Sequence, residues 1–249
     1  MTTIASTHNP KLKALRRLQT KRGRAADGRF VVEGEDLVTA AEQAGCKPVE
    51  GFRLAGSGLG GENFFDVEHS VLARASTLGS GTRVMGVYEQ RWSSAVGPLC
   101  VYLHGVRDPG NVGTVLRSAL AFGASCVVLG PHCADPYGPK AVRASMGAIF
   151  TVALARVKDV SELPGERIAL VADASETLSG PLDDAAEAAV TLLVGAEREG
   201  LPADVVAACE RSARIPIASE SLNAAMAATV ALYEMTRQGG RDHDTVPAS

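Results

Sequence analysis

One stretch of the chain combines a turn, a helix start and an arginine at a spacing suited to chemistry. Residues 104–117 have the sequence HGVRDPGNVGTVLR and follow a strand-like run, so Asn111 could cap a new helix. Gly113 and Arg117 lie four residues apart on one helix face, and the missing side chain at Gly113 would leave room for a ligand beside the guanidinium. Alone, the stretch is equally a turn followed by a cap.

Two later segments favour a ligand site over a simple turn at residues 104–117. Residues 193–201, LVGAEREGL, form a strand-like run that enters a glycine-bounded acidic loop, and residues 215–223, IPIASESLN, form another that enters the last helix. All three segments are expected at carboxyl ends of strands, where open α/β sheets bind ligands. We therefore expect them to converge on one site.

A different glycine-rich stretch, GSGLGG at residues 56–61, matches the G-x-G-x-x-G pattern of dinucleotide sites. That pattern requires a helix to begin at its last glycine. Residues 62–67, ENFFDV, are strand-like instead, so we interpret these glycines as a loop.

Short apolar runs alternate with helical patterns, which predicts an α/β fold with a mostly parallel sheet covered on both faces. The expected strands are 30–32, 49–54, 64–67, 84–88, 99–103, 126–129, 149–153, 168–171, 190–194 and the run from 215. The expected helices are 12–18, 34–44, 70–75, 111–122, 139–147, 203–211 and 222–237, with residues 22–28 breaking the first helix. We divide the chain into residues 1–92, a basic arm with a small α/β domain; residues 97–240, a second α/β domain; and a tail, residues 241–249.

Composition excludes several classes of protein. The five cysteines form no C-x-x-C pair, which argues against a disulfide framework and a thiolate metal site; we expect no metal. No long apolar run and no signal-like N-terminus occur, so we expect no membrane span and a cytoplasmic location.

The first 30 residues are strongly basic although the whole chain has a net charge of −3. This charge run is either a solvated helix or a footprint for nucleic-acid phosphates, and charge alone favours neither. The candidate residues for contacting nucleic-acid phosphates are Lys11, Lys13, Arg16, Arg17, Lys21, Arg22 and Arg24.

The three motif segments, in this order and spacing across residues 99–237, resemble the SpoU (TrmH-like) branch of the SPOUT RNA methyltransferases, which methylate a ribose 2′-hydroxyl. Residues 28–90, with FVVEG at 30–34, resemble that family's small substrate-binding domain. The resemblance implies a trefoil-knotted C-terminal domain, a homodimer, S-adenosylmethionine as cofactor, and structured RNA as substrate, with ribosomal RNA ahead of transfer RNA.

The resemblance also implies two sets of site residues. The cofactor would be held by Gly195, Glu197, Gly200, Ile215, Ile217, Ser221, Leu222 and Asn223. The reactive constellation would be Asn111, Arg117, Glu197, Ser221 and Asn223.

Arginine keeps its proton at neutral pH, so we favour Arg117 as a clamp on the ribose and adjacent phosphate, with a deprotonated Arg117 acting as base as the alternative. Glu197 would order Arg117 or its own loop, and the two asparagines would orient backbone or ribose. The chain departs from the family in having Ala196 and Arg198 beside Glu197, where a small polar residue and a glycine are usual. If the glycine position needs a positive φ, the loop differs or Arg198 is strained.

Two other functions remain open from sequence alone. One is an RNA-binding protein that has lost catalysis, against which the intact Asn111, Arg117, Glu197 and Asn223 argue. The other is a nucleotide-dependent metabolic enzyme with an ordinary doubly wound sheet.

Overall fold

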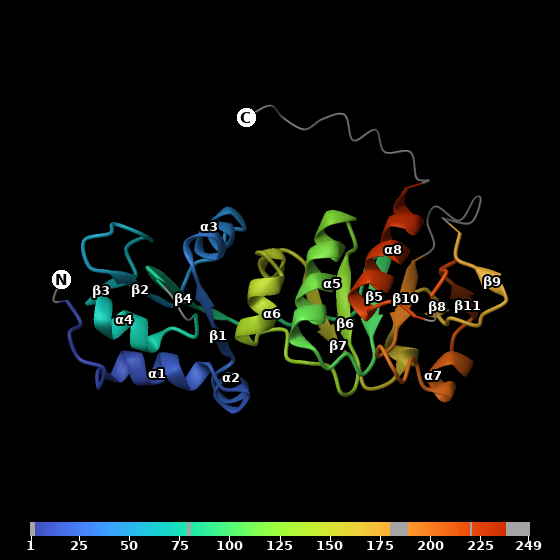
Figure 1. Ribbon diagram of the computed structural model, residues 1–249, viewed down its shortest axis with the longest axis horizontal. Coiled ribbons are helices and arrows are strands. Elements are labelled where there is room, and N and C mark those ends of the chain that lie inside the picture. Colours follow the sequence, from blue (N-terminus) through green and yellow to red (C-terminus); the bar gives the residue numbers. More distant parts are fainter. Residues whose placement is uncertain (1–2, 79–80, 180–188, 220, 238–249) are drawn as a thin grey trace.

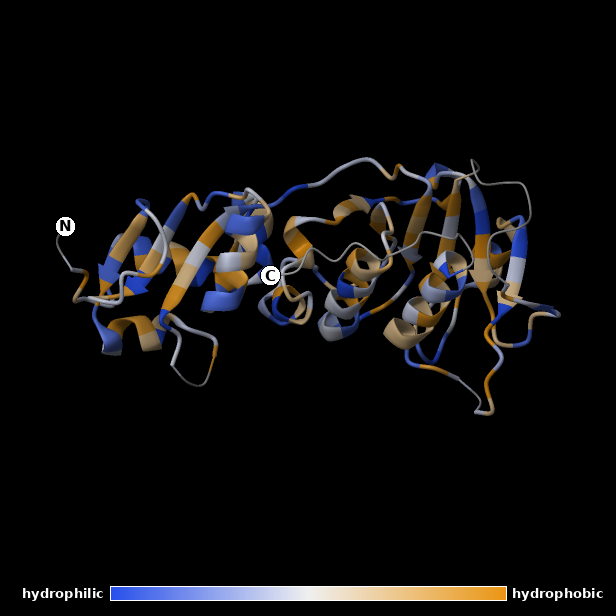
Figure 2. Cartoon of the chain, turned by 90° about the horizontal axis from the view of Figure 1, so that it is seen from above, coloured by the Kyte–Doolittle hydropathy of each residue, from blue (hydrophilic) through white to orange (hydrophobic). Residues whose placement is uncertain are grey.

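The computed structural model describes residues 3–78, 81–179, 189–219 and 221–237. Two lobes lie side by side along the long axis of the molecule, each built around one β-sheet (Figure 1). Figure 2 shows apolar positions along the strands of both lobes. The fold is therefore α/β, as the sequence predicts.

The N-terminal lobe contains a four-stranded sheet in the order β1-β4-β2-β3. β4 runs antiparallel to β1 and β2, and β2 runs parallel to β3. The strands are β1 (Arg29–Glu33), β2 (Glu50–Leu54), β3 (Phe64–Val67) and β4 (Val84–Glu89), and the helices are α1 (Pro10–Leu18), α2 (Lys21–Asp27), α3 (Glu35–Gln43) and α4 (His69–Ala75). Helix α1 buries Leu12, Leu15 and Leu18 and leaves its basic residues outside, which is the predicted amphipathic pattern.

The C-terminal lobe contains a seven-stranded parallel sheet in the order β7-β6-β5-β10-β8-β11-β9. Its strands are β5 (Leu99–Leu103), β6 (Cys126–Leu129), β7 (Ala153–Arg156), β8 (Glu166–Leu170), β9 (Glu176–Thr177), β10 (Val190–Val194) and β11 (Arg211–Arg214), and its α-helices are α5 (Pro109–Ala121), α6 (Pro139–Ala144), α7 (Ala203–Ala207) and α8 (Ala224–Thr236). The described part of this lobe also contains two short 3₁₀ helices, Ala148–Phe150 and Val160–Glu162.

Both faces of this sheet are covered, which explains its continuous apolar strands. Val101 and Leu103 face the core shared with α5 and α8, whereas Cys100 and Tyr102 face the opposite core, which includes Val205 of α7. The order of strands also places the ends of β5, β10 and β8 next to one another.

Three local predictions are wrong. Residues 22–28 are not a break, because Thr20 caps a second helix, α2, which ends at Gly28 with φ 64°. The strand expected at 149–153 is displaced to β7 because residues 148–150 form a 3₁₀ turn. The helix expected at 203–211 ends at Ala207, and β11 begins at Arg211, so Ile215 and Ile217 follow a strand instead of forming one.

The lobes share a buried boundary. Arg24 of α2 forms an ion pair with Asp135 at 2.8 Å, and both side chains are nearly buried. Beside this pair, Phe30 of β1 packs on Tyr137, with ring centroids 4.7 Å apart. Residues of both lobes thus belong to one continuous apolar core.

Candidate active site

Polar side chains from three distant parts of the chain meet at the carboxyl edge of the large sheet. Asn111 of α5 donates a hydrogen bond from Nδ2 to Oε1 of Glu197, in the loop after β10. Asn223, directly before α8, donates from Nδ2 to Oδ1 of Asn111 at 3.2 Å. The structure therefore brings Asn111, Glu197 and Asn223 together, as predicted for the three segments.

Two helix caps hold the asparagines in place. Asp108, not Asn111, caps α5: its carboxylate accepts from the backbone N–H groups of Gly110 at 2.6 Å and Asn111 at 3.1 Å. The predicted cap at Asn111 is therefore wrong, and its side chain is free to bond Glu197. Asn223 does cap α8, since its Oδ1 accepts from the N–H groups of Ala225 and Met226.

Lys140 of α6 donates to Asp108 at 2.7 Å. This hydrogen bond, with those from the Asn111 and Gly110 backbone, lowers the pKa of the Asp108 carboxyl below its usual value. The capping carboxylate therefore stays ionised, which favours its contact with the positive end of the α5 dipole.

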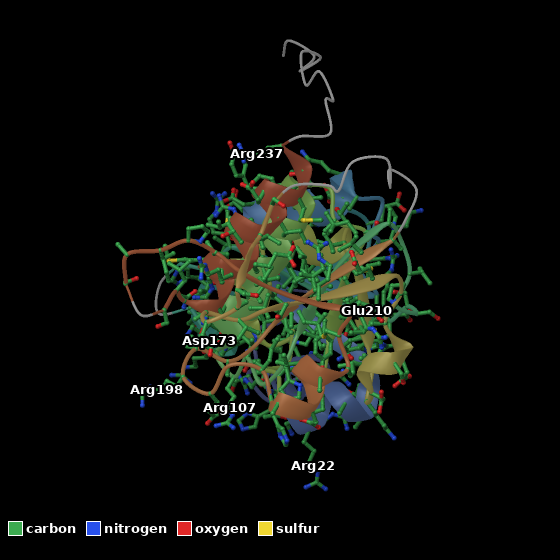
Figure 3. The ribbon with its side chains drawn as sticks, turned by 90° about the vertical axis from the view of Figure 1, so that its right-hand side faces the viewer. Arg22, Arg107, Asp173, Arg198, Glu210 and Arg237 are labelled. Atoms are coloured by element: carbon green, nitrogen blue, oxygen red, sulfur yellow. The ribbon has the colours of Figure 1, made fainter. Side chains whose placement is uncertain are left out.

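Both glycines of the loop after β10 are required by its shape. A Cβ on Gly195 would lie 2.1 Å from the carbonyl carbon of Gly200, so only glycine allows this close approach. Gly200 has φ 65°, whereas Arg198 is not among the non-glycine residues with positive φ in the described chain. The unusual Arg198 is thus accommodated without backbone strain, and Figure 3 shows it extending outward from the loop.

A cavity of about 410 Å³ opens beside this loop. Of the predicted cofactor residues, the following line it: Gly195, Glu197, Gly200, Ile215, Ile217, Ser221 and Leu222. A neighbouring cavity of about 560 Å³ is lined by Asn111, Asn223, Arg107 and Asp108 together with residues 196–199, which also line the first cavity. The loop that carries Glu197 thus lies between the two cavities.

Other lining residues were missed by the sequence analysis. Leu170, which ends β8, and Val171, Ala172 and Asp173, which follow it, line the first cavity because β8 lies beside β10. That neighbourhood depends on the order of strands, which the sequence did not reveal. Arg107, which pairs with Glu199 at 3.4 Å, did have a signal, since it stands within the first motif.

Arg117 lies outside the hydrogen-bonded group of Asn111, Glu197 and Asn223. Its side chain is exposed on α5, makes no hydrogen bond or ion pair with the described residues, and lines neither cavity. The space predicted beside it at Gly113 is absent, because a Cβ there would lie 2.3 Å from the carbonyl oxygen of Ala141 and 2.7 Å from Cβ of Ala144. Gly113 instead allows α5 to pack closely on α6.

The candidate RNA-binding residues fall into different environments. Lys11 pairs with Glu50 and Arg17 with Asp27, and Arg16 donates to the carbonyl of Thr7. Lys13, Lys21 and Arg22 are exposed, and Figure 3 shows Arg22 projecting from the surface.

Arg24 differs from the rest because it is 5% exposed and ion-paired with Asp135. It also donates to the carbonyls of Leu18 and Gln19. The prediction that Arg24 contacts RNA is therefore wrong, because its polar atoms are used inside the protein.

In the part of the chain that the structure describes, no group of three or more His, Cys, Asp or Glu side chains is placed to hold a metal ion. No described helix is long and apolar enough to cross a bilayer.

A parallel α/β sheet with ligand-binding loops at its carboxyl edge defines a small-molecule-binding α/β domain. Residues 98–233 match the model of the SpoU rRNA Methylase family, and residues 9–86 match the MRM3-like substrate binding domain. The chain belongs to the SpoU rRNA methylase family.

Individual relatives cover nearly the whole chain. It is 32% identical to an uncharacterized tRNA/rRNA methyltransferase of Synechocystis sp., over 94% of this chain and 93% of that protein. It is 27% identical to the 23S rRNA (guanosine(2553)-2′-O)-methyltransferase RlmP of Bacillus subtilis, over 94% and 99%. The AdoMet-bound rRNA methyltransferase of Sinorhizobium meliloti superposes with a TM-score of 0.83 at 30% identity, over 95% of this chain and 97% of that one.

Proposed function

We propose that this protein transfers a methyl group from S-adenosylmethionine to a ribose 2′-hydroxyl of structured RNA, with ribosomal RNA ahead of transfer RNA. The observation that carries the proposal is the meeting of Asn111, Glu197 and Asn223 beside a ligand-sized cavity. The relative from Bacillus subtilis, whose name states 2′-O-methylation of 23S rRNA, supports the substrate class.

The cavity suits the proposed cofactor. Its volume lies within the range of small-molecule pockets, roughly 300–1,000 Å³. Ile215, Ile217 and Leu222 offer apolar surface, and Gly195 brings the backbone close to Gly200 in a loop that a Cβ would disrupt. When bound there, S-adenosylmethionine would supply a methyl group on a positively charged sulfur.

The hydrogen-bonded group serves to fix the reacting partners. Asn111 holds one oxygen of the Glu197 carboxylate, and Asn223 holds Asn111 while capping α8. These bonds reduce the freedom of the loop that separates the two cavities, so a hydroxyl entering the second cavity meets pre-arranged groups. Ser221 lines the first cavity and would contribute polar contacts there.

We assign to Arg117 the role of a clamp that contacts the substrate ribose and its adjacent phosphate. An exposed guanidinium on the same helix as Asn111 can stabilise negative charge that grows on the attacking oxygen. The alternative, in which Arg117 accepts the hydroxyl proton, requires the uncharged guanidine, which is rare at neutral pH.

The N-terminal lobe would grip the RNA. Lys13, Lys21 and Arg22 provide exposed positive charge on α1 and α2, next to the partly satisfied Lys11, Arg16 and Arg17. We retain residues 1–92 as the substrate-binding domain, residues 97–240 as the methyltransferase domain and residues 241–249, which lie outside the described residues, as a tail.

The finer assignments are a trefoil knot in residues 97–240, a homodimer and a cytoplasmic location. Exposed apolar side chains on α8 favour the homodimer: Met226 is 58% exposed, Val230 40% and Tyr233 52%. Leu120 of α5 adds to this surface at 44% exposure. Light scattering should give twice the monomer mass, and Met226→Glu should reduce it.

The test of the function is transfer of labelled methyl groups from S-adenosylmethionine to purified ribosomal RNA and to transfer RNA, followed by mapping of ribose methylation. Label in ribosomal RNA at a 2′-hydroxyl is expected. RNA binding without label would favour a protein that has lost catalysis. Calorimetric binding of NAD but not of S-adenosylmethionine would favour a metabolic enzyme instead.

A further inference from the structure

One cation of the loop after β10 has no role in the proposed function. Arg198 is exposed and lines both cavities of the candidate active site. It makes no hydrogen bond or ion pair with the described residues, and Figure 3 shows its side chain extending away from the loop. Arg198 is therefore placed to meet an anion that enters either cavity.

The acids that line the second cavity leave Arg198 without a partner. Asp108 pairs with Lys140 at 2.7 Å and also accepts from two backbone N–H groups at the start of α5. The carboxylate of Glu197 accepts from the side chain of Asn111. Among the described residues, neither acid forms an ion pair with Arg198, so its positive charge remains available to a ligand.

The third lining acid, Glu199, pairs with Arg107 at 3.4 Å, and these side chains are 65% and 69% exposed. An ion pair this exposed contributes at most about 1 kcal/mol, because water screens both charges. A phosphate offers a guanidinium two acceptor oxygens in matching geometry, so it can replace Glu199 as the partner of Arg107 at little cost. Arg107 and Arg198 would then both present guanidinium groups to an anion in the second cavity.

Arg107 and Arg198 lie on the side of the molecule that also carries the basic helix α2. Viewed along the long axis, Figure 3 shows Arg22 of α2, Arg107 and Arg198 toward the lower side of the molecule. Arg237, at the end of α8, lies at the upper end of the same view. An RNA backbone held by α2 can therefore extend along this side to the second cavity.

We propose that Arg107 and Arg198 bind one of the two backbone phosphates that flank the target ribose, Arg117 being assigned to the other. The inference rests on the proposed function, because it requires RNA as substrate. The carboxylate of S-adenosylmethionine is the competing anion, because Arg198 also lines the first cavity. Arg107 lines only the second cavity, beside Asn111 and Asn223, which favours the RNA.

The first test is Arg198→Gln in the full chain, which removes the charge of an exposed side chain and should leave the melting temperature unchanged. RNA affinity, measured by gel shift without cofactor, should fall about ten-fold, the loss of a hydrogen bond to a charged group. The slope of log affinity against log salt should decrease by about one, for one lost phosphate contact. The KM for RNA should rise by the same factor as the affinity falls. Arg198→Lys keeps the charge and should recover part of the affinity.

The second test uses the pair between Arg107 and Glu199. Arg107→Gln should lower RNA affinity about ten-fold, whereas Glu199→Gln frees Arg107 and should raise it about two- to three-fold, the usual worth of an exposed ion pair. The matched control is the pair between Arg237 and Glu234, which is also an Arg–Glu pair on the surface. Arg237→Gln and Glu234→Gln change the net charge by the same amounts and should leave RNA affinity nearly unchanged.

Two outcomes would overturn the phosphate subsite directly. If Arg198→Gln weakens calorimetric binding of S-adenosylmethionine and leaves RNA binding normal, Arg198 holds the carboxylate of the cofactor instead. If Arg237→Gln weakens RNA binding as much as Arg198→Gln does, the effect comes from net charge and not from a contact.

The wild-type protein separates this inference from the proposed function. If it methylates RNA while Arg107→Gln or Arg198→Gln binds RNA normally, the phosphate subsite is wrong and the methyltransferase proposal is intact. If the wild-type protein neither binds nor methylates RNA, both proposals are wrong.

Discussion

The loops at the carboxyl edge of the large sheet and the basic helices α1 and α2 were both singled out by residue type, but they use their polar groups differently. At the sheet edge, Asn111 bonds Glu197 and Asn223 across 86 and 112 residues of chain. In α1 and α2, Lys11 and Arg17 pair with acids of their own lobe and Arg24 is buried. A run of basic residues in the sequence therefore suggests more accessible positive charge than the folded protein presents. In contrast, the distance between the three motifs in the sequence gives no sign of how closely their side chains meet in the fold.

The largest expected effect tests Arg117, a member of the proposed reactive set that lies outside the hydrogen-bonded group. Arg117→Ala should reduce methyl transfer about 100-fold or more, the usual effect of removing a group that stabilises charge in a transition state. Binding of S-adenosylmethionine, measured by calorimetry, should stay the same because Arg117 lines neither cavity.

Arg117→Lys serves as the comparison, since a lysine keeps the charge and loses the planar fork. Partial activity in this variant supports a clamp. Full activity in Arg117→Ala would contradict any direct role.

The next largest effect concerns the buried ion pair between Arg24 of α2 and Asp135. Arg24→Met leaves Asp135 buried without its cation and should lower the free energy of unfolding by about 3–5 kcal/mol, measured by urea denaturation. Arg24→Met combined with Asp135→Asn removes both charges and should recover part of that loss. A stable single variant with reduced RNA binding would instead mean that Arg24 contacts RNA.

A smaller effect separates exposed from paired cations. Replacing Lys13, Lys21 and Arg22 with Gln should reduce the slope of log affinity for RNA against log salt by about two to three, one for each lost phosphate contact. Replacing Lys11 and Arg17 with Gln is the matched control and should change the slope less, because acids already neutralise them. Equal effects per residue would remove the distinction drawn between the two groups.

The smallest effect is a pH dependence at the sheet edge. Burial, followed by the charge of His132, lowers the pKa of His104, whose Nδ1 lies 2.9 Å from the Tyr102 hydroxyl. The unfolded chain therefore binds this proton more readily, and stability is lost as pH falls below about 6.5. His104→Asn should show a smaller drop in melting temperature between about pH 7.5 and pH 5.5. An unchanged drop would assign the pH dependence to other groups.

Local structure was largely predictable from the sequence. Apolar runs such as Cys126–Leu129 identified the buried strands, and the three motifs identified the loops that meet. Properties that depend on tertiary neighbours were not predictable. The sequence did not reveal that β8 lies beside β10, which brings Asp173 to the cavity.

Gly113 illustrates the same limit within a motif. Its spacing from Arg117 was correctly assigned to one helix face, but whether that face meets a ligand or another helix depends on the position of α6. The same holds for Arg24: whether its side chain is buried or exposed depends on the position of Asp135, which the sequence does not reveal.

The ion pair between Arg24 and Asp135 joins the basic helices to the C-terminal lobe at a boundary where both lobes bury apolar residues. The lobes cannot swing apart without exposing the apolar core that they share, including the contact between Phe30 and Tyr137, which makes a hinge at this boundary costly. If RNA is held by α1 and α2, as we propose, it would therefore meet the loops around Glu197 at a fixed separation. The distance between the basic helices and the candidate active site would then be fixed, so any flexibility needed to bring a ribose to that site would have to come from the RNA.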